Sequence, residues 1–320
     1  MRSPYYGNGL HAKILKLAYL ICKIAQMIDW ENLRYLLAVA HTGSLSGAAR
    51  HLGVDHATVS RRLAGLEEQV EVRLLERLPR ACRLTPIGQR VVELAQGMEE
   101  SAYAIERLID ASRSPLSGTV TLSAPPVLVA NFLAGRLASF RQQNPAVRIS
   151  VSSETRKVSL ARREADVILR LSRPEEPSSV VRKIGRMPFG LYASRQYIHL
   201  HHPPAWEFIT YNEGFADVPR RQWLARFQGE RASACEINDV NGHLTAAQAG
   251  AGVAGLPVFI GDTDARLQRV APDAEPFSCD IWIAVHRDLR RTPPVRAVMD
   301  FIAKIVADHP GLESLPNKRV

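Results

Sequence analysis

The sequence has few of the features that mark enzymes, metalloproteins and membrane proteins. Its 320 residues include only four cysteines, Cys22, Cys82, Cys235 and Cys279, with no C-x-x-C pair and no histidine at metal-ligand spacing. It contains no H-E-x-x-H, G-x-S-x-G or Walker A motif. No apolar run approaches the roughly 18 residues that a membrane span needs. We therefore expect no catalytic residues, no metal site, no cofactor and a reducing, cytoplasmic location.

The chain does contain a pattern of two short helices around Asp55. Apolar residues between Leu45 and Leu52 fall at i, i+3, i+4 and i+7, which predicts an amphipathic helix that ends at Gly53. Asp55 is a suitable N-cap for a second helix, whose apolar stripe runs from Val59 to Val70. Two such helices joined by a tight turn indicate a helix-turn-helix, whose second helix enters the major groove of DNA.

The outward face of the second helix carries side chains suited to DNA. Hydroxyls and guanidiniums bond phosphates, and an arginine can also bond guanine through two parallel hydrogen bonds. A hairpin-like segment at residues 78–85 follows and predicts a basic wing. The expected DNA-contacting residues are His56, Thr58, Ser60, Arg61, Arg62, Arg80 and Arg83. The alternative is a solvated helical hairpin that carries two arginines by chance.

Thr85 and Pro86 are typical of a helix start, and no proline interrupts the chain from there until Pro115. At about 1.5 Å per residue this helix is about 40 Å long, too long to bury its apolar face in a small domain. Its apolar positions alternate by four and three, a pattern of two-stranded coiled coils. The seam consists of Ile87, Val91, Leu94, Met98, Ser101, Ile105 and Leu108. The alternative is a long helix packed on its own domain.

The first 26 residues contain four of the nine net positive charges and no acidic side chain. Their apolar stretch is broken by Lys16, and Ile21 precedes Cys22 where a lipoprotein signal requires a small residue. We expect an extension that is disordered or results from a mis-assigned start, with natural translation beginning at Met27. The net charge of +9 is therefore weaker evidence for DNA binding than the clustering of arginines.

These motifs together resemble the LysR-type transcriptional regulator family. The segments that carry the resemblance are 29–40, 43–49, 58–63, 66–67 and 84–88, and they occur in the family's usual order. Segments 237–240, 249–257 and 282–286 resemble parts of its effector domain, so the resemblance covers the chain from Met27 onward. It implies an α/β fold with an N-terminal winged helix-turn-helix, a long linker helix and a C-terminal periplasmic-binding-protein-like domain of two α/β subdomains, usually assembled as a tetramer.

A segment rich in proline, serine and glycine at 112–118 marks a hinge, after which the sequence period changes. Strands expected at 119–123, 147–151 and 166–169, with a helix at 132–140, imply a mostly parallel sheet. We expect an extension at 1–26, a winged helix-turn-helix domain at 27–85, a linker helix at 86–113 and an effector-binding domain at 119–320. Subdomain I should comprise about 119–190 and 280–320, and subdomain II about 191–279.

Parallel sheets bind ligands at the carboxyl ends of their strands, often against a helix amino terminus that favours anions. This rule selects Ser123, Ala124, Pro125, Pro126, Ser152 and Ser153. Alternatively, the hydroxyls in this set only cap helices. The family resemblance adds Tyr211, Asn212 and Asp239 on the far wall of a hinged cleft. Arg170 and Arg173 are further candidates for attracting a carboxylate-bearing effector.

The glycines at 250–255 satisfy G-x-G-x-x-G, the fingerprint of dinucleotide-binding proteins. A dinucleotide site needs a strand before the glycines and a helix after them. Here residues 244–249 are expected to be helical and residues 253–258 to form the following strand. The order is reversed, so we interpret these glycines as a helix end and a tight turn.

The sequence thus favours a sequence-specific DNA-binding transcriptional regulator, modulated by a small-molecule effector bound in the cleft of its C-terminal domain. The expected partners are double-stranded operator DNA, the effector, further copies of the chain in a homodimer or homotetramer, and RNA polymerase. One alternative is a solute-binding or enzymatic α/β protein with incidental N-terminal helices. A ligand-independent architectural DNA binder is another.

Overall fold

The computed structural model describes residues 28–78, 81–112, 116–212, 219–273 and 275–314. The chain divides into two compact units, Met1–Ala102 and Tyr103–Val320, which are described in turn. The expected N-terminal extension at 1–26 lies outside the described residues. Within those residues, no helix combines the length and apolarity that crossing a bilayer requires.

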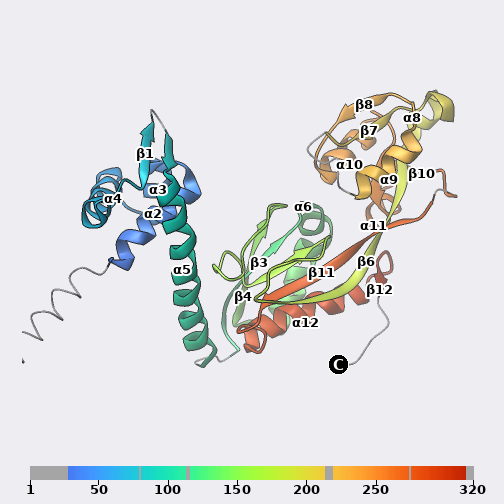
Figure 1. Ribbon diagram of the computed structural model, residues 1–320. Helices are drawn as coiled ribbons and strands as arrows, with labels where there is room; N and C mark the ends of the chain where they lie inside the picture. Colours follow the sequence, from blue (N-terminus) through green and yellow to red (C-terminus); the bar gives the residue numbers. More distant parts are fainter. Residues whose placement is uncertain (1–27, 79–80, 113–115, 213–218, 274, 315–320) are drawn as a thin grey trace, which may run out of the picture. The chain divides into compact units, whose positions relative to one another are not determined.

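The first unit begins with three helices and a two-stranded hairpin (Figure 1). The elements are α2 (Trp30–Thr42), α3 (Leu45–Leu52), α4 (His56–Val70), β1 (Leu75–Leu78) and β2 (Ala81–Leu84). Both predicted helices of the helix-turn-helix are confirmed. Gly53 ends α3 in the left-handed conformation at φ +68°, and the Asp55 carboxylate caps α4 by accepting from the Thr58 amide at 2.6 Å.

A small apolar core holds the three helices together. Leu36 of α2, Ala48 of α3 and the α4 residues Val59, Leu63 and Leu66 are all buried. The small Ala48 allows α3 and α4 to approach closely, as the spacing predicts. The stripe is therefore where the sequence pattern puts it, and the opposite face of α4 stays outside the core.

Main-chain hydrogen bonds and one carboxylate attach the hairpin to the helices. The Cys82 amide of β2 donates at 2.9 Å to the carbonyl of Gly43, which lies in the turn between α2 and α3. Glu67, near the end of α4, accepts from the amides of Leu74 and Leu75 at 2.7 and 3.0 Å. The hairpin starts at Leu75, which pairs with Leu84, and therefore begins earlier than the predicted segment 78–85.

The helix α5 (Pro86–Ser112) follows the hairpin and begins at the predicted proline. The Thr85 hydroxyl caps it by accepting from the Gly88 amide at 3.0 Å. Val92 and Ala95 of α5 are buried against the core of the first unit. The predicted long helix is therefore confirmed, and one side of its first half belongs to that core.

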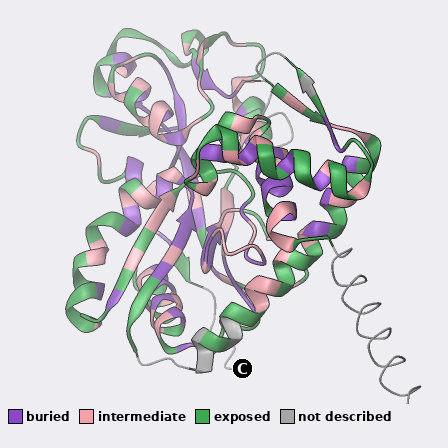
Figure 2. Cartoon of the chain, turned by 90° about the vertical axis from the view of Figure 1, so that its left-hand side faces the viewer, coloured by how far each residue is buried: buried purple, intermediate pink, exposed green. Residues whose placement is uncertain are grey.

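The second unit is built on an eight-stranded sheet with the order β10-β6-β11-β5-β3-β4, to which β9 and β12 add on β6. The strands are β3 (Gly118–Ala124), β4 (Val147–Ser153), β5 (Val167–Arg170), β6 (Ser179–Ser194), β9 (Ala254–Pro257), β10 (Leu267–Val270), β11 (Phe277–His286) and β12 (Glu313–Ser314). The central strands of this sheet carry many of the buried residues coloured in Figure 2, whereas β12 is exposed. The strands predicted at 119–123, 147–151 and 166–169 are confirmed as β3, β4 and β5.

The prediction of a mostly parallel sheet is wrong. Among the described strands of this sheet, β3 is parallel to β4 and to β5, whereas the remaining pairs are antiparallel, including those of β11 with β5 and β6. The 16-residue β6 pairs first with β11 and then, over its second half, with β9 and β10. Because β11 carries the chain back along β6, these two long strands must run in opposite directions.

Helical turns connect β3 to β4, but not as the single predicted helix at 132–140. They comprise α6 (Pro126–Leu128), the π-helix η1 (Val129–Leu133), the 3-10 turn η2 (Ala134–Arg136) and α7 (Leu137–Gln143). Pro126 suits the first helical position, so the turns start earlier than predicted. A π-helix widens the backbone locally and often marks a functional position.

The segment between β6 and β11 forms a small parallel pair flanked by helices. Its elements are α8 (Arg195–Leu200), η3 (Pro203–Ala205), β7 (Phe208–Thr210), α9 (Pro219–Gln228), β8 (Ser233–Glu236), α10 (Val240–Gln248) and α11 (Val258–Gly261). The helix α12 (Pro293–Ala307) follows β11. Gly250, at φ +83°, lies between α10 and β9, so the reversed order predicted for the G-x-G-x-x-G segment is confirmed.

Candidate functional site

The first predicted surface is the face of α4 that lies away from the core. His56 and Arg61 are exposed, whereas Thr58 and Ser60 are half-buried. The Thr58 amide bonds the Asp55 carboxylate and is the main cause of the lowered Asp55 pKa, so the cap is ionised at neutral pH. Capping fixes the first turn of α4, and this turn carries the start of the proposed contact set.

Arg62 is exposed on α4, and its guanidinium lies beside α2. Its guanidinium donates to the Asn32 side chain at 3.3 Å, approaches the Asp29 carboxylate at 3.9 Å and lies 5.9 Å from the centre of the Tyr35 ring. All three partners belong to α2 or its cap. Arg62 therefore connects α4 to α2, a role that the sequence pattern did not indicate.

The predicted wing carries Arg83, which is exposed on β2 opposite Glu76 of β1. Arg80, the other predicted wing contact, lies outside the described residues. The hairpin itself has the expected position directly after the second helix of the motif.

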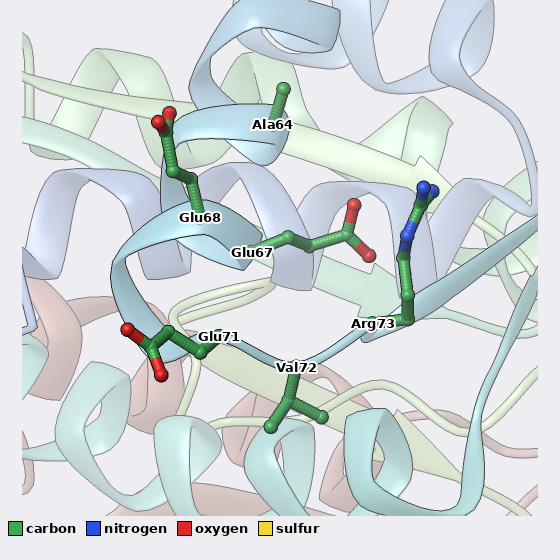
Figure 3. Close-up of a pocket in the computed structure, with 6 residues that line it drawn as sticks. All are labelled: Ala64, Glu67, Glu68, Glu71, Val72 and Arg73. Carbon is green, nitrogen blue, oxygen red and sulfur yellow. The ribbon is translucent and has the colours of Figure 1, made fainter.

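An open hollow lies at the C-terminal end of α4, and its negative charge makes it unsuitable for binding anions. It is lined by Ala64, Glu67, Glu68, Glu71, Val72 and Arg73. Glu67 extends toward the start of β1 on the side of Arg73, whereas Glu68 and Glu71 point the other way (Figure 3). Three carboxylates beside the negative end of a helix repel phosphate. This end of α4 is therefore unsuited to the DNA backbone.

The second predicted surface lies at the carboxyl ends of β3 and β4. The parallel register places Ser123 opposite Ser152 and Ala124 opposite Ser153. Ser123, Ala124 and Pro125 are buried, Pro126 and Ser152 are half-buried, and Ser153 is exposed. The structure thus brings the six residues selected on β3, β4 and the start of α6 into one neighbourhood.

Glu154, which the sequence reasoning missed, occupies the centre of this neighbourhood. Its Oε1 accepts from the Ser152 hydroxyl at 2.7 Å and from the Ser123 hydroxyl at 3.4 Å. Its other oxygen pairs with Arg156 at 2.5 Å. The hydrogen bond from Ser152 is the largest cause that lowers the Glu154 pKa, and the Arg156 charge acts in the same direction. Glu154 is therefore an ionised carboxylate.

Arg170 closes the same neighbourhood from the end of β5. One of its Nη atoms donates to the Ser123 hydroxyl at 2.9 Å, and the other donates to the Ser123 and Leu169 carbonyls at 3.0 and 2.7 Å. Burial is the main cause that lowers its pKa. The guanidinium of Arg173, the other candidate, lies 5.7 Å from the centre of the Trp282 ring.

The residues expected on the far wall of the cleft lie in two loops. Tyr211 and Asn212 follow β7, and Asp239 precedes α10. Tyr211 is buried and stacks on His243 with 4.2 Å between ring centres, and the Arg220 guanidinium lies 5.0 Å from the same tyrosine ring. Burial raises the Tyr211 pKa. Asp239 caps α10 by accepting from the Gly242 amide at 3.0 Å, and Asn212 is half-buried.

One side chain reaches from the first group of predicted residues to the second. Asn131 of η1 donates to the Asn241 side chain, in the first turn of α10, at 2.8 Å. The sequence analysis selected Asp239, two positions before Asn241, and missed Asn131. A π-helix next to a predicted ligand loop was the missing signal, and residue patterns do not reveal π-helices.

These elements define a DNA-binding winged helix-turn-helix that continues through a long helix into an α/β ligand-binding domain. Residues 30–89 match the bacterial regulatory helix-turn-helix protein, lysR family, and residues 113–306 match the LysR substrate binding domain. The chain belongs to the LysR family of transcriptional regulators, which are not enzymes.

Two relatives agree with this assignment, and a solved structure has a similar fold. The Mau operon transcriptional activator of Paracoccus denitrificans is 25% identical over 88% of this chain and 98% of its own length. A probable HTH-type transcriptional regulator, LrrA, of Synechococcus elongatus is 31% identical over 71% of this chain and 80% of its own. Full-length CbnR, solved with its target DNA, has a TM-score of 0.55 and 21% identity, covering 87% of this chain and 99% of that one.

Proposed function

We propose that this LysR-family regulator binds a roughly palindromic promoter site as a dimer or tetramer and responds to an effector at the carboxyl ends of β3 and β4. The observation that carries the proposal is the division of α4 into a buried apolar stripe and an outer face with exposed His56 and Arg61. An outer face of this kind suits phosphate and base-edge contacts. The half-buried Thr58 and Ser60, with Arg62, Arg80 and Arg83, complete the proposed contact set.

Self-association is proposed to occur through α5. Ile87, Leu94, Met98 and Ile105 of the seam are exposed, with Leu94 at 72%. The Ser101 hydroxyl donates to the Gly97 carbonyl at 2.9 Å, so its polar group is satisfied within the helix. A second copy of α5 would bury this apolar row. Exposure of the row argues against the alternative in which the whole helix packs on its own domain.

The domain limits follow from the same proposal. We assign DNA binding to residues 27–85, dimerisation to 86–113 and effector binding to 119–320, with subdomain I at about 119–190 and 280–320 and subdomain II at about 191–279. Ser123, Ala124, Pro125, Pro126, Ser152 and Ser153 would contact the effector from one side, and Tyr211, Asn212 and Asp239 from the other. The protein would act in the cytoplasm, where its promoter DNA and RNA polymerase are found.

The mechanism is proposed to be a shift between two arrangements of the oligomer. An effector shifts such an equilibrium only by the difference between its affinities for the two states. The shift would change how the paired α4 helices bend the operator, and so the access of RNA polymerase.

A gel-shift experiment with the full chain tests this function. The probe is the intergenic DNA upstream of the gene, at a fixed salt concentration of about 100 mM and with excess unrelated duplex, because non-specific binding depends steeply on salt. Specific retardation is expected. Equal retardation of unrelated DNA of the same length would contradict sequence-specific regulation and favour an architectural DNA binder.

A further inference from the structure

We propose that Glu154 is a specificity-determining residue, whose carboxylate fills the anion position beside Ser123 and Ser152 and keeps carboxylate groups of effectors out of it. The inference rests on the proposed function, because it concerns the effector site of the same domain. It assigns to this position a ligand group that is neutral or cationic and donates hydrogen bonds.

The position of Glu154 is one where parallel α/β sheets commonly bind anions. It directly follows β4, at the carboxyl edge that β4 shares with β3. Its amide donates to the Ala124 carbonyl at 3.0 Å, which fixes the backbone against the end of β3. The carboxylate is therefore held at this edge by the sheet itself.

The two serine hydroxyls have no proton left for a second anion. A hydroxyl donates one hydrogen bond, and both Ser152 and Ser123 direct theirs to the same Glu154 oxygen. Ser123 also accepts from Arg170, so its hydroxyl is engaged both as donor and as acceptor. An effector carboxylate entering here would meet an ionised carboxylate and no free hydroxyl proton.

The Glu154 carboxylate already has a charged partner without a ligand. Arg156 pairs with Glu154 and, at 3.0 Å, with Glu164, which Arg162 also approaches at 3.7 Å. Arg170 donates to neutral oxygens of Ser123 and Leu169. A ligand group that donates hydrogen bonds would find the Glu154 carboxylate 20% exposed, whereas an anion would be repelled by the charge of that carboxylate.

The carboxylate of Glu176, in the same unit, has a purely structural role and different hydrogen-bond donors. Glu176 accepts from the amides of Leu160 and Ala161 at 2.9 and 3.0 Å and from the Ser159 hydroxyl at 2.9 Å, and so closes a turn of the main chain. Glu154 is held by side-chain hydroxyls and a guanidinium, the groups that would bind the carboxylate of a free ligand. Its contacts therefore mimic those of a bound ligand.

The proposal is tested by removing the Glu154 carboxylate and supplying formate, a free carboxylate, in its place. The thermal unfolding midpoint of the full chain is measured for wild type, Glu154→Ala and Glu164→Ala in sodium formate and in sodium chloride of equal ionic strength. Formate should raise the midpoint of Glu154→Ala by about 2–4 °C relative to chloride, because it binds the vacated position. Wild type and Glu164→Ala should not respond, although Glu164 pairs with the same Arg156.

The isosteric Glu154→Gln keeps the position filled and should respond less to formate than Glu154→Ala. An equal response of wild type and Glu154→Ala would overturn the proposal, as would a Glu154→Ala response no larger than that of Glu164→Ala. Operator binding of wild type without any effector, measured in parallel, separates the two proposals. Its loss would contradict the regulatory function, whereas the formate result concerns Glu154 alone.

Discussion

The side chain of Asn131 donates a hydrogen bond to that of Asn241 over 2.8 Å, although the two residues are 110 positions apart in the chain. Asn131 belongs to the π-helix after β3, which follows the predicted effector loop, and Asn241 to the first turn of α10, next to the predicted effector residue Asp239. The same Asn131 amide also donates to the Val127 carbonyl at 3.0 Å. The contact therefore joins the two halves of the proposed effector site directly.

We expect Asn131→Ala to loosen the connection between these halves. Loss of one such hydrogen bond changes an opening equilibrium by about 1 kcal/mol, or about fivefold. Amide hydrogen exchange of residues 238–248 should then speed up by about that factor. Asn144→Ala is the matched control, because the side-chain amide of Asn144 donates to the Phe140 carbonyl, four positions away. Unchanged exchange at α10 in Asn131→Ala would show that the contact does not hold the halves together.

Arg61→Ala should weaken operator binding. If Arg61 reads a base, the substitution costs about 1–3 kcal/mol of specific binding and relaxes the sequence preference. If it holds a phosphate, binding to all sequences weakens alike and the salt dependence falls by about one unit. Arg296→Ala removes the same charge from an exposed position in α12 and serves as the control. Unchanged operator affinity in a gel shift would rule out both roles of Arg61.

Leu94→Glu should separate the subunits. Leu94 is 72% exposed in the single chain, and burial of a leucine between two helices contributes about 1.5–3 kcal/mol that a glutamate forfeits. The mass in solution, measured by light scattering after size exclusion, should fall toward that of the monomer. Leu200→Glu alters a leucine that is 69% exposed in α8 and should leave the mass unchanged. Equal masses for wild type and Leu94→Glu would place the subunit contact elsewhere.

Gly88→Ala should destabilise the first unit. A Cβ atom at Gly88 would lie 2.1 Å from the Leu74 carbonyl oxygen, and backbone cannot yield as a flexible side chain can. We expect a loss of about 1–3 kcal/mol in the free energy of unfolding by urea. Gly65→Ala, inside α4, meets no atom within 4 Å and should stabilise by up to about 1 kcal/mol. Similar effects of both substitutions would mean that the close approach at Gly88 has no energetic consequence.

The local elements were predictable because their determinants lie within a few residues of one another. Gly53 ends α3, Asp55 caps α4 through Thr58, and Thr85 with Pro86 starts α5. The length of α5 could likewise be predicted from the absence of proline before Pro115, and the order of helix and strand around Gly250 from its neighbours. Each of these features depends on backbone preferences and on hydrogen bonds over three or four positions.

The tertiary structure alone decided which distant side chains meet. Ser123 and Glu154 are 31 positions apart, Arg62 and Asn32 are 30 apart, and no local pattern encodes either contact. The antiparallel pairing of β6 with β11 also depends on the path of the chain between them, so alternation of strands and helices misled the sheet prediction. The sequence thus determined the DNA-binding elements and the family. Strand pairing placed the Glu154 carboxylate where an anionic effector was expected, because neighbouring strand ends meet only after the chain has folded.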